Sequence, residues 1–227
     1  MKKSERKIIM INFKKISGEK AFLLARKLEK VDPHICEMFD VILALQPQDA
    51  YHISSKVKLP LFVQDISSYP ESQFLSAIDR GSLKKSNIRG VILNHPQKKL
   101  TLDALEESIA VGRKLGLEIL LCASSIDEAV QINDRYTPDY IAVENEQLIG
   151  KDISLVQYCP EVVPNVLDRI NNRILFGGGI KSPEDIKFVI QNGGFGVLVA
   201  SLIINSKNPL ATLENLLKPE FYNKPAN

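Results

Sequence analysis

The feature of this chain that most constrains its fold is the repeated alternation of short apolar runs with longer amphipathic segments. An apolar run of about four to six residues is typical of a parallel strand buried on both faces, whereas apolar residues three or four apart indicate a helix. Strand and helix alternate about eight times, which favours an α/β fold closed into a (β/α)8 barrel over an open sheet. The expected strands are Ile8–Phe13, Val41–Leu45, Leu61–Val63, Val91–Leu93, Ile119–Cys122, Tyr140–Val143, Ile174–Phe176 and Val197–Val199.

The segments between these runs carry helical signals of unequal strength. Apolar residues recur at helical spacing in Lys20–Leu28 and Leu102–Leu115, which predicts helices there. The Ser-Pro-Glu-Asp sequence at residues 182–185 predicts a helix start, because serine caps helices and proline fits the first helical position. The second and third units have the weakest support: Pro60 precedes a short run, and residues 67–74 are polar with little helical pattern.

Length and charge are consistent with a single domain that comprises residues 1–227. No glycine-, serine- or proline-rich linker divides the chain, and barrels often exceed about 200 residues as one unit. The 29 basic and 27 acidic residues give a net charge of +2, so composition does not suggest nucleic-acid binding. No apolar stretch approaches the ~20 residues of a membrane span, and the basic N-terminal end lacks the apolar core of a signal peptide. We therefore expect a cytoplasmic protein that binds neither nucleic acid nor membranes.

The cysteines and two of the histidines do not indicate a metal site. Cys36, Cys122 and Cys159 have no metal-type spacing and are interpreted as small buried or partly buried apolar residues. Such residues suit a reducing compartment. His34 and His52 lie in polar or helical contexts, so we expect surface or structural roles for both.

Polar side chains that could do chemistry follow three of the apolar runs directly. Asn12 and Lys14 stand at the end of the first run, His95 follows the fourth, and Glu144 follows the sixth. Because the carboxyl ends of parallel strands meet at one mouth of a barrel, we expect these four side chains to converge. The alternative is that each is an ordinary structural or surface residue at a strand end.

The C-terminal quarter carries a separate signal for phosphate binding. The glycines Gly177–Gly179 follow the seventh run and precede a helix start, while the eighth run ends on Ala200 and Ser201. Small residues let backbone N–H groups approach a dianion, and a phosphate held after strands seven and eight near a helix start is a recurrent barrel site. The alternative is that the glycines only form a tight turn. By itself this signal indicates a phosphate-binding barrel and not a reaction.

Taken together, these motifs resemble the triosephosphate isomerase family in its short archaeal-type form. The order and spacing of the motifs agree with the family over nearly the whole chain. The quoted segments are Ile11-Asn12-Phe13-Lys14, Asn94-His95, Val143-Glu144 through Leu148-Ile149-Gly150, Gly177-Gly178-Gly179-Ile180 and Leu198-Val199-Ala200-Ser201.

The resemblance implies interconversion of glyceraldehyde 3-phosphate and dihydroxyacetone phosphate through an enediolate, with no metal or organic cofactor. Glu144 would be the base that removes a carbon-bound proton, and His95 would polarise the carbonyl and move protons between oxygens. Lys14 would provide fixed positive charge, and Asn12 would donate an orienting hydrogen bond. The implied phosphate contacts are Lys14, Asn12 and the amides of Gly150, Gly178, Gly179, Ala200 and Ser201, with Gly150 in a lid that excludes water.

The sequence departs from the family pattern at several of these positions. Pro96 and Gln97 follow His95 where the family has Ser-Glu, so a hydroxyl, an amide donor and a negative charge are absent. Asn145 stands at the first lid hinge in place of proline, and residues 151–152 are Lys-Asp where Thr-Gly is expected. We therefore expect reduced activity.

A further departure concerns assembly. Residues 74–76 are Phe-Leu-Ser where the family carries a Thr-Gly turn that enters the partner subunit. We still expect a homo-oligomer, a dimer or a tetramer. Two other functions are left open by the residues: a weak or inactive paralogue that binds a phosphorylated metabolite, and another phosphate-binding barrel enzyme such as a sugar-phosphate epimerase or a prenyl-phosphate transferase.

Overall fold

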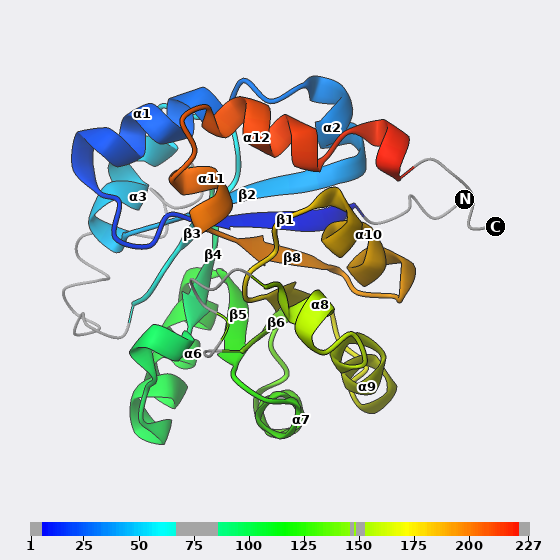
Figure 1. Cartoon of the computed structure of the whole chain (residues 1–227). Helices are drawn as coiled ribbons and strands as arrows, with labels where there is room; N and C mark the ends of the chain where they lie inside the picture. Colours follow the sequence, from blue (N-terminus) through cyan, green and yellow to red (C-terminus); the bar gives the residue numbers. More distant parts are fainter. Residues whose placement is uncertain (1–5, 67–85, 146–147, 149–152, 223–227) are drawn as a thin grey trace, which may run out of the picture.

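The strands form a closed barrel in which every neighbouring pair is parallel (Figure 1). The computed structural model describes residues 6–66, 86–145, 148 and 153–222. Strand order around the ring follows the chain from β1 to β8, and β8 pairs back onto β1, so the predicted (β/α)8 barrel is confirmed. The strands are β1 (Lys7–Asn12), β2 (Phe39–Leu45), β3 (Leu61–Val63), β4 (Ile88–Leu93), β5 (Glu118–Ala123), β6 (Tyr140–Glu144), β7 (Ile174–Gly177) and β8 (Gly196–Val199).

Helices surround the ring on its outer side (Figure 1). The predicted helix over 102–115 is confirmed, and α10 begins with the expected cap, in which the Ser182 hydroxyl accepts a hydrogen bond from the Asp185 amide. No helix in the described part of the chain is long and apolar enough to cross a membrane. The α-helices are α1 (Gly18–Leu28), α2 (Pro33–Met38), α3 (Pro47–Ser54), α6 (Leu102–Leu115), α7 (Ile126–Tyr136), α8 (Leu155–Tyr158), α9 (Val162–Arg169), α10 (Pro183–Gln191), α11 (Ser201–Ile204) and α12 (Pro209–Leu216), and the 3-10 helices are η1 (Pro96–Lys98) and η3 (Pro219–Phe221).

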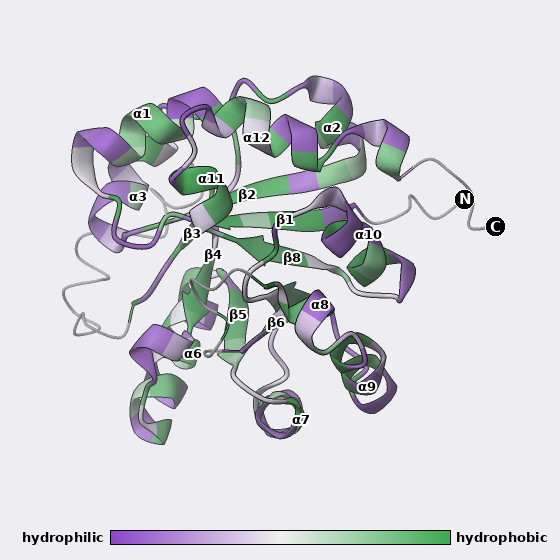
Figure 2. Cartoon of the chain, in the orientation of Figure 1, coloured by the Kyte–Doolittle hydropathy of each residue, from purple (hydrophilic) through white to green (hydrophobic). Residues whose placement is uncertain are grey.

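The hydrophobic core has two layers, which explains why the strands are apolar along their whole length. Alternate strand residues point into the barrel, as Met10 and Cys122 do, or outward against the helices, as Ile9 and Ile11 do. Figure 2 shows the resulting contrast between mostly hydrophobic strands and helices that carry both kinds of residue. Cys122 is fully buried, whereas Cys36 and Cys159 are partly exposed. All three are free thiols, in agreement with their interpretation as small apolar residues.

The amino end of the barrel is closed by a polar cluster. Arg89 of β4 donates to Glu118 of β5 over 2.8 Å and to the hydroxyl of Tyr140 over 3.0 Å, and it also forms an ion pair with Asp40 of β2. Nearby, the guanidinium of Arg173 lies 5.3 Å from the ring centre of Phe195. A ligand must therefore enter from the opposite, carboxyl end of the strands.

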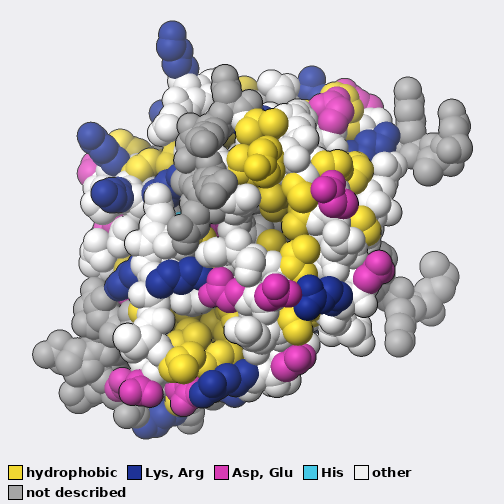
Figure 3. All heavy atoms as spheres, turned by 60° about the horizontal axis from the view of Figure 1, so that its bottom comes forward, with side chains coloured by type: hydrophobic (Ala, Val, Ile, Leu, Met, Phe, Trp, Pro, Cys, Tyr) yellow, Lys and Arg dark blue, Asp and Glu magenta, His cyan; other side chains and the backbone are white. Residues whose placement is uncertain are grey.

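The outer surface shows no segregation of charge on the face that Figure 3 presents. Basic and acidic side chains of the described residues lie intermixed there, interrupted by small hydrophobic patches. This distribution agrees with the nearly balanced composition. A single-sign stripe of the kind that binds nucleic acid is not present among the described residues of this face.

Candidate active site

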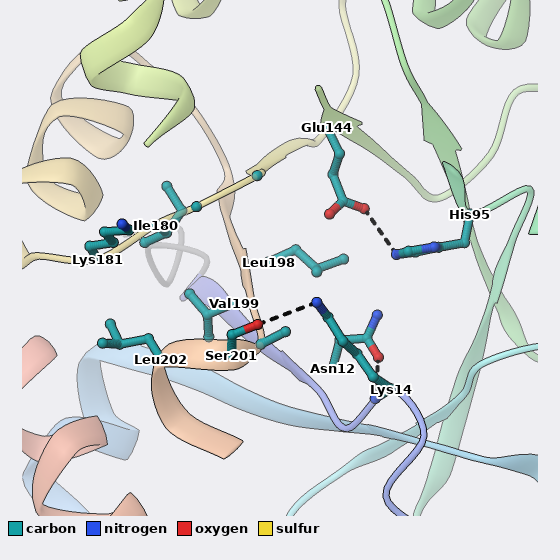
Figure 4. A pocket seen from close by; sticks show the side chains of 13 residues that line it. Asn12, Lys14, His95, Glu144, Ile180, Lys181, Leu198, Val199, Ser201 and Leu202 are labelled. Carbon is teal, nitrogen blue, oxygen red and sulfur yellow. Dashed lines mark hydrogen bonds and ion pairs between the residues drawn. The ribbon is translucent and has the colours of Figure 1, made fainter. Parts of the chain in front are cut away.

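A cavity of about 330 Å³ opens at the carboxyl ends of the strands and is lined by all four predicted chemical side chains (Figure 4). Asn12, Lys14, His95 and Glu144 occupy one part of its wall. The predicted phosphate residues Gly178, Gly179, Ala200 and Ser201 occupy the other part, together with Ile180, Lys181, Leu198, Val199 and Leu202. Gly150, the fifth predicted phosphate contact, lies outside the described residues.

Asn12 is the last residue of β1, and its amide is fixed by two donors. Its Oδ1 accepts a hydrogen bond from the Lys14 backbone over 2.9 Å and another from Gln64 Nε2 over 3.0 Å. The side chain is only 4% exposed. Because both bonds use the oxygen, the Nδ2 group is left to donate toward the cavity.

Lys14 follows in a strained backbone conformation that directs its side chain across the cavity. Its φ of 51° is in the left-handed region, which costs a residue with a Cβ about 1 to 2 kcal/mol. Gln46 stabilises this turn by donating to the Lys14 carbonyl over 2.6 Å. The ammonium donates to the Ser201 hydroxyl over 3.4 Å, so the side chain reaches from the turn after β1 to the start of α11 (Figure 4).

His95 is held by the 3-10 helix that follows it. Its Nδ1 accepts a hydrogen bond from the Gln97 amide over 3.2 Å, which requires that nitrogen to be unprotonated. A neutral ring then carries its proton on Nε2, which lies 3.6 Å from Glu144 Oε1. Pro96 occupies the first helical position, where proline is favoured. The proline therefore does not deprive the ring of its backbone donor, because that donor belongs to the next residue.

Glu144 ends β6 in an apolar environment that changes its acidity. Burial raises the pKa of its carboxyl to about 7, although the positive charge of Lys14 and a hydrogen bond from the Cys122 thiol act in the opposite direction. Its Oε1 is buried without a hydrogen-bond partner among the described residues. The neighbouring Gly177 makes room, because a Cβ there would lie 2.6 Å from Glu144 Cγ. A carboxylate of this kind is suited to take a proton near neutral pH.

Two contributors to the site were not predicted from the sequence. Gln64 follows β3 and donates to Asn12, as described above, and also to the Ala44 carbonyl over 3.0 Å. It carries the same signal as the other four residues, a polar side chain directly after an apolar run. Cys122 contacts Glu144 from inside the barrel, but a cysteine within an apolar run gives no such signal.

The glycine loop after β7, which is predicted to contact phosphate, has a constrained backbone. Gly178 and Gly179 have φ values of 90° and 82°, and a Cβ on Gly179 would lie 2.5 Å from the Ile153 carbonyl oxygen. The Gly178 carbonyl accepts from the Leu155 amide over 2.8 Å. The Ser154 hydroxyl, at the start of α8, donates to Asp185 of α10 over 2.8 Å, so the start of α8 is fixed both to the loop after β7 and to α10. The positive φ disfavours a residue with a Cβ at both positions, and at Gly179 there is also no space for one.

Only part of the predicted lid falls among the described residues. Leu148 is 3% exposed, and its amide donates to the Asn145 carbonyl over 3.0 Å. The distal hinge at residues 151–152 and the segment at residues 74–76 lie outside the described part of the chain. No group of three or more His, Cys, Asp or Glu side chains suited to a metal ion occurs within the described ranges.

The fold and the cavity together define a class of protein. The chain is a (β/α)8 barrel whose mouth combines a buried carboxyl, an imidazole, an ammonium group and a glycine-rich loop suited to phosphate. The family model described as triosephosphate isomerase matches residues 7–217. The chain belongs to the triosephosphate isomerase family.

Known proteins of this family align with nearly the whole chain. The triosephosphate isomerase of Methanosarcina acetivorans is 30% identical over 220 residues, which are 92% of this chain and 97% of the relative. That of Methanosarcina barkeri is 31% identical with the same shares of both chains. That of Saccharolobus solfataricus is 30% identical over 217 residues, with 92% and 94% covered.

One solved structure shows the fold alone. The thiamine phosphate pyrophosphorylase from Pyrococcus furiosus is similar with a TM-score of 0.60, and the match covers 97% of this chain and 96% of that one. Sequence identity is 16%, so the likeness concerns the barrel and not the reaction.

Proposed function

We propose that this member of the triosephosphate isomerase family interconverts glyceraldehyde 3-phosphate and dihydroxyacetone phosphate through an enediolate. The observation that carries the proposal is the pairing of a buried Glu144, whose pKa is raised to about 7, with His95 Nε2 at 3.6 Å, in the cavity that the phosphate loops also line. Aldose–ketose isomerisation needs a base for a carbon-bound proton and a donor for the adjacent oxygen. Neither a metal ion nor an organic cofactor takes part in the proposed reaction.

Proton transfer is assigned to two side chains. Glu144 takes a proton from the carbon next to the carbonyl, and the electron pair of that C–H bond forms the carbon–carbon double bond of the enediolate. The Nε2–H of neutral His95 donates to the developing oxyanion and passes protons between the two oxygens. Glu144 then returns its proton to the neighbouring carbon, so the products balance without any other reactant.

Binding is assigned to the remaining residues of the cavity. Lys14 stabilises the negative charge of both phosphate and enediolate, and Asn12 orients the substrate through its Nδ2 group. The amides near Gly178, Gly179, Ala200 and Ser201 hold the phosphate, with Gly150 as a further contact from the lid.

We expect the rate of isomerisation to be lower than that of family members with the usual residues at positions 97 and 145. Gln97 is exposed and neutral where the family has a glutamate, and Asn145 replaces a hinge proline. These differences favour one alternative, a paralogue that binds a phosphorylated metabolite with little turnover.

Assembly as a homo-oligomer, a dimer or a tetramer, and a cytoplasmic location complete the proposal. Large apolar side chains are exposed on the isolated chain, among them Leu102 at 58% and Tyr51 at 47%. Sedimentation of the purified protein measures the assembly directly.

The deciding experiment is an isomerase assay with purified protein, combined with calorimetric titration of 2-phosphoglycolate. Turnover that is lost in Glu144→Gln and kept in Glu107→Gln, an exposed carboxylate on α6, supports the proposal. Binding of 2-phosphoglycolate without turnover selects the non-catalytic paralogue. A protein that neither turns over triose phosphates nor binds 2-phosphoglycolate would overturn both.

A further inference from the structure

A second cavity of about 320 Å³ lies on the other side of Asn12, Lys14 and His95, which line both. Its far wall is formed by residues that follow β2, β3 and β4, including Asp65 and Lys98. None of these wall residues has a role in the proposed proton transfers. They are nevertheless placed directly behind the side chains that do.

Asp65 is the carboxylate of this wall, and it is 9% exposed. It follows β3 by two residues and forms an ion pair with the Lys98 ammonium. Removing a carboxylate from water is costly unless a partner compensates for the lost hydration. The pair therefore fixes the position of Lys98 relative to the end of β3.

Lys98 in turn belongs to the 3-10 helix η1 that begins directly after His95. Its amide donates to the His95 carbonyl over 2.7 Å, while the Gln97 amide donates to His95 Nδ1 over 3.2 Å. A 3-10 helix of three residues has little stability of its own. The ion pair at Lys98, the last residue of η1, therefore helps to hold this helix in place. The helix positions the Gln97 amide, whose hydrogen bond requires His95 Nδ1 to be unprotonated.

We propose that Asp65 is a positioning residue for His95, acting through Lys98 and η1 to keep Nδ1 unprotonated and Nε2–H directed at the substrate. The inference rests on the proposed function for its catalytic consequence but not for its geometry. The second cavity also differs in where its acidic group stands. Gln97 is neutral, and the acidic side chain of the cavity wall is Asp65.

The expected signature of Asp65→Asn is a change in catalysis with little change in stability. The Lys98 side chain is 50% exposed, and an ion pair with one partner this open contributes little to folding. Misplacement of a catalytic ring, by contrast, lowers the rate strongly. We expect Asp65→Asn and Lys98→Gln each to lower kcat on the order of tenfold, with KM little changed. The melting temperature should change little in Asp65→Asn and fall in Lys98→Gln, which takes the Lys98 ammonium away from the nearly buried Asp65 carboxylate.

A double-mutant cycle and a conservative variant test the coupling. If Asp65 acts through Lys98, the double variant Asp65→Asn/Lys98→Gln loses no more activity than either single variant. Lys98→Arg retains the charge and is expected to retain most of kcat. Glu106→Gln is the control, because it removes an exposed ion pair with Arg135 on the outside of the barrel.

NMR of the ring nitrogens in histidine-labelled protein reports the protonation of His95 and does not require turnover. The native ring should give Nδ1 as an unprotonated nitrogen and Nε2 as a protonated one, and Asp65→Asn should broaden or shift this pair while Glu106→Gln leaves it intact. A folded Asp65→Asn protein with native ring signals and native kcat would overturn the proposal. If Asp65→Asn does not fold, the same criteria apply to Lys98→Gln, whose replaced side chain is half exposed.

The two proposals fail in different ways. A parent protein without isomerase activity would overturn the proposed function, whereas the NMR comparison would still decide whether Asp65 controls the ring. An active parent whose Asp65 and Lys98 variants are indistinguishable from it would overturn only the inference about Asp65.

Discussion

The two sides of the active-site cavity are built by different means. The proposed phosphate side, after β7 and β8, includes Gly178 and Gly179, whose φ values of 90° and 82° are strained for any residue with a Cβ. The proposed proton-transfer side, after β4 and β6, consists of the His95 and Glu144 side chains, and the imidazole is oriented by the backbone amide of Gln97. The family pattern is kept on the first side and altered on the second.

This difference follows from what each construction can tolerate. The glycine loop has no space for a Cβ at Gly179, where the added atom would lie 2.5 Å from the Ile153 carbonyl oxygen. A side chain oriented by a backbone amide tolerates substitutions in the adjoining turn as long as that amide keeps its place. The turn after His95 illustrates this, because Pro96 fits the first position of η1 and Gln97 still supplies its amide.

The largest effect is expected from a variant that should impair proton transfer but not phosphate binding. Glu144→Gln should lower kcat by roughly 10² to 10⁴-fold, because the amide cannot accept the carbon-bound proton. Binding of 2-phosphoglycolate, measured by calorimetry, should change far less, since the phosphate side is untouched. Equal losses in both measurements would show that the two sides do not act separately.

The converse experiment replaces a glycine on the phosphate side. Gly179→Ala combines backbone strain at φ 82° with a contact of 2.5 Å to Ile153, so affinity for phosphate and the melting temperature should both fall. Gly116→Ala is the matched control, because its φ is 77° but no atom lies within 4 Å of the added Cβ. Both variants carry a strain of about 1 to 2 kcal/mol, and the excess loss in Gly179→Ala measures the contact. Equal melting temperatures and affinities in the two variants would refute the steric argument.

The proton-transfer side should also respond to pH. Burial raises the pKa of Glu144 from an ordinary value of 4.5 to about 7, so kcat/KM should fall as the pH drops below about 7. The folded state binds this proton more tightly than the unfolded state, so stability should decrease as the pH rises from about 4.5 to 7, by about 3 kcal/mol from this group.

Glu144→Gln removes this titration and should raise the melting temperature at pH 8 but not at pH 4.5. Calorimetric scans of parent and variant at the two pH values measure the difference. A variant that is no more stable than the parent at pH 8 would mean that the buried charge is compensated by contacts other than those with Lys14 and Cys122.

The smallest effect is expected where the sequence departs most visibly from the family. Gln97→Glu restores the family's charge, but the side chain is exposed, so the gain in kcat should not exceed about fivefold. Pro96→Ser should add little, because the proline already suits its position. A gain of a hundredfold in steady-state kcat would show that the altered turn, and not Asp65, limits the enzyme.

Much of the barrel could be predicted because its strands are buried on both faces and therefore appear as apolar runs. The beginnings of β2 and β4 could not, since Asp40 and Arg89 lie in these strands yet are polar. They belong to the cluster that closes the amino end of the barrel, and the pairing that makes them favourable there joins strands far apart in the sequence.

The residues of the candidate site also divide into those that the sequence could predict and those that it could not. Asn12, Lys14, His95 and Glu144 could be found because polar residues at strand ends converge by the geometry of any parallel barrel. Cys122 could not, because its contact with Glu144 is made by a side chain that otherwise behaves as apolar. The family-based view of Pro96 as the loss of a donor overlooked that the amide of the next residue is the one within reach of His95.

The pairing of β8 with β1 also has a consequence for folding. Ile8 of β1 stands opposite Gly196 of β8, so the last ladder joins residues from opposite ends of the sequence. Contacts of this kind are slow to form, because a long loop must close before they stabilise anything. Until then β1 and β8 each present a free edge to other chains. We therefore expect refolding to compete with aggregation until the ladder between β8 and β1 has closed the ring.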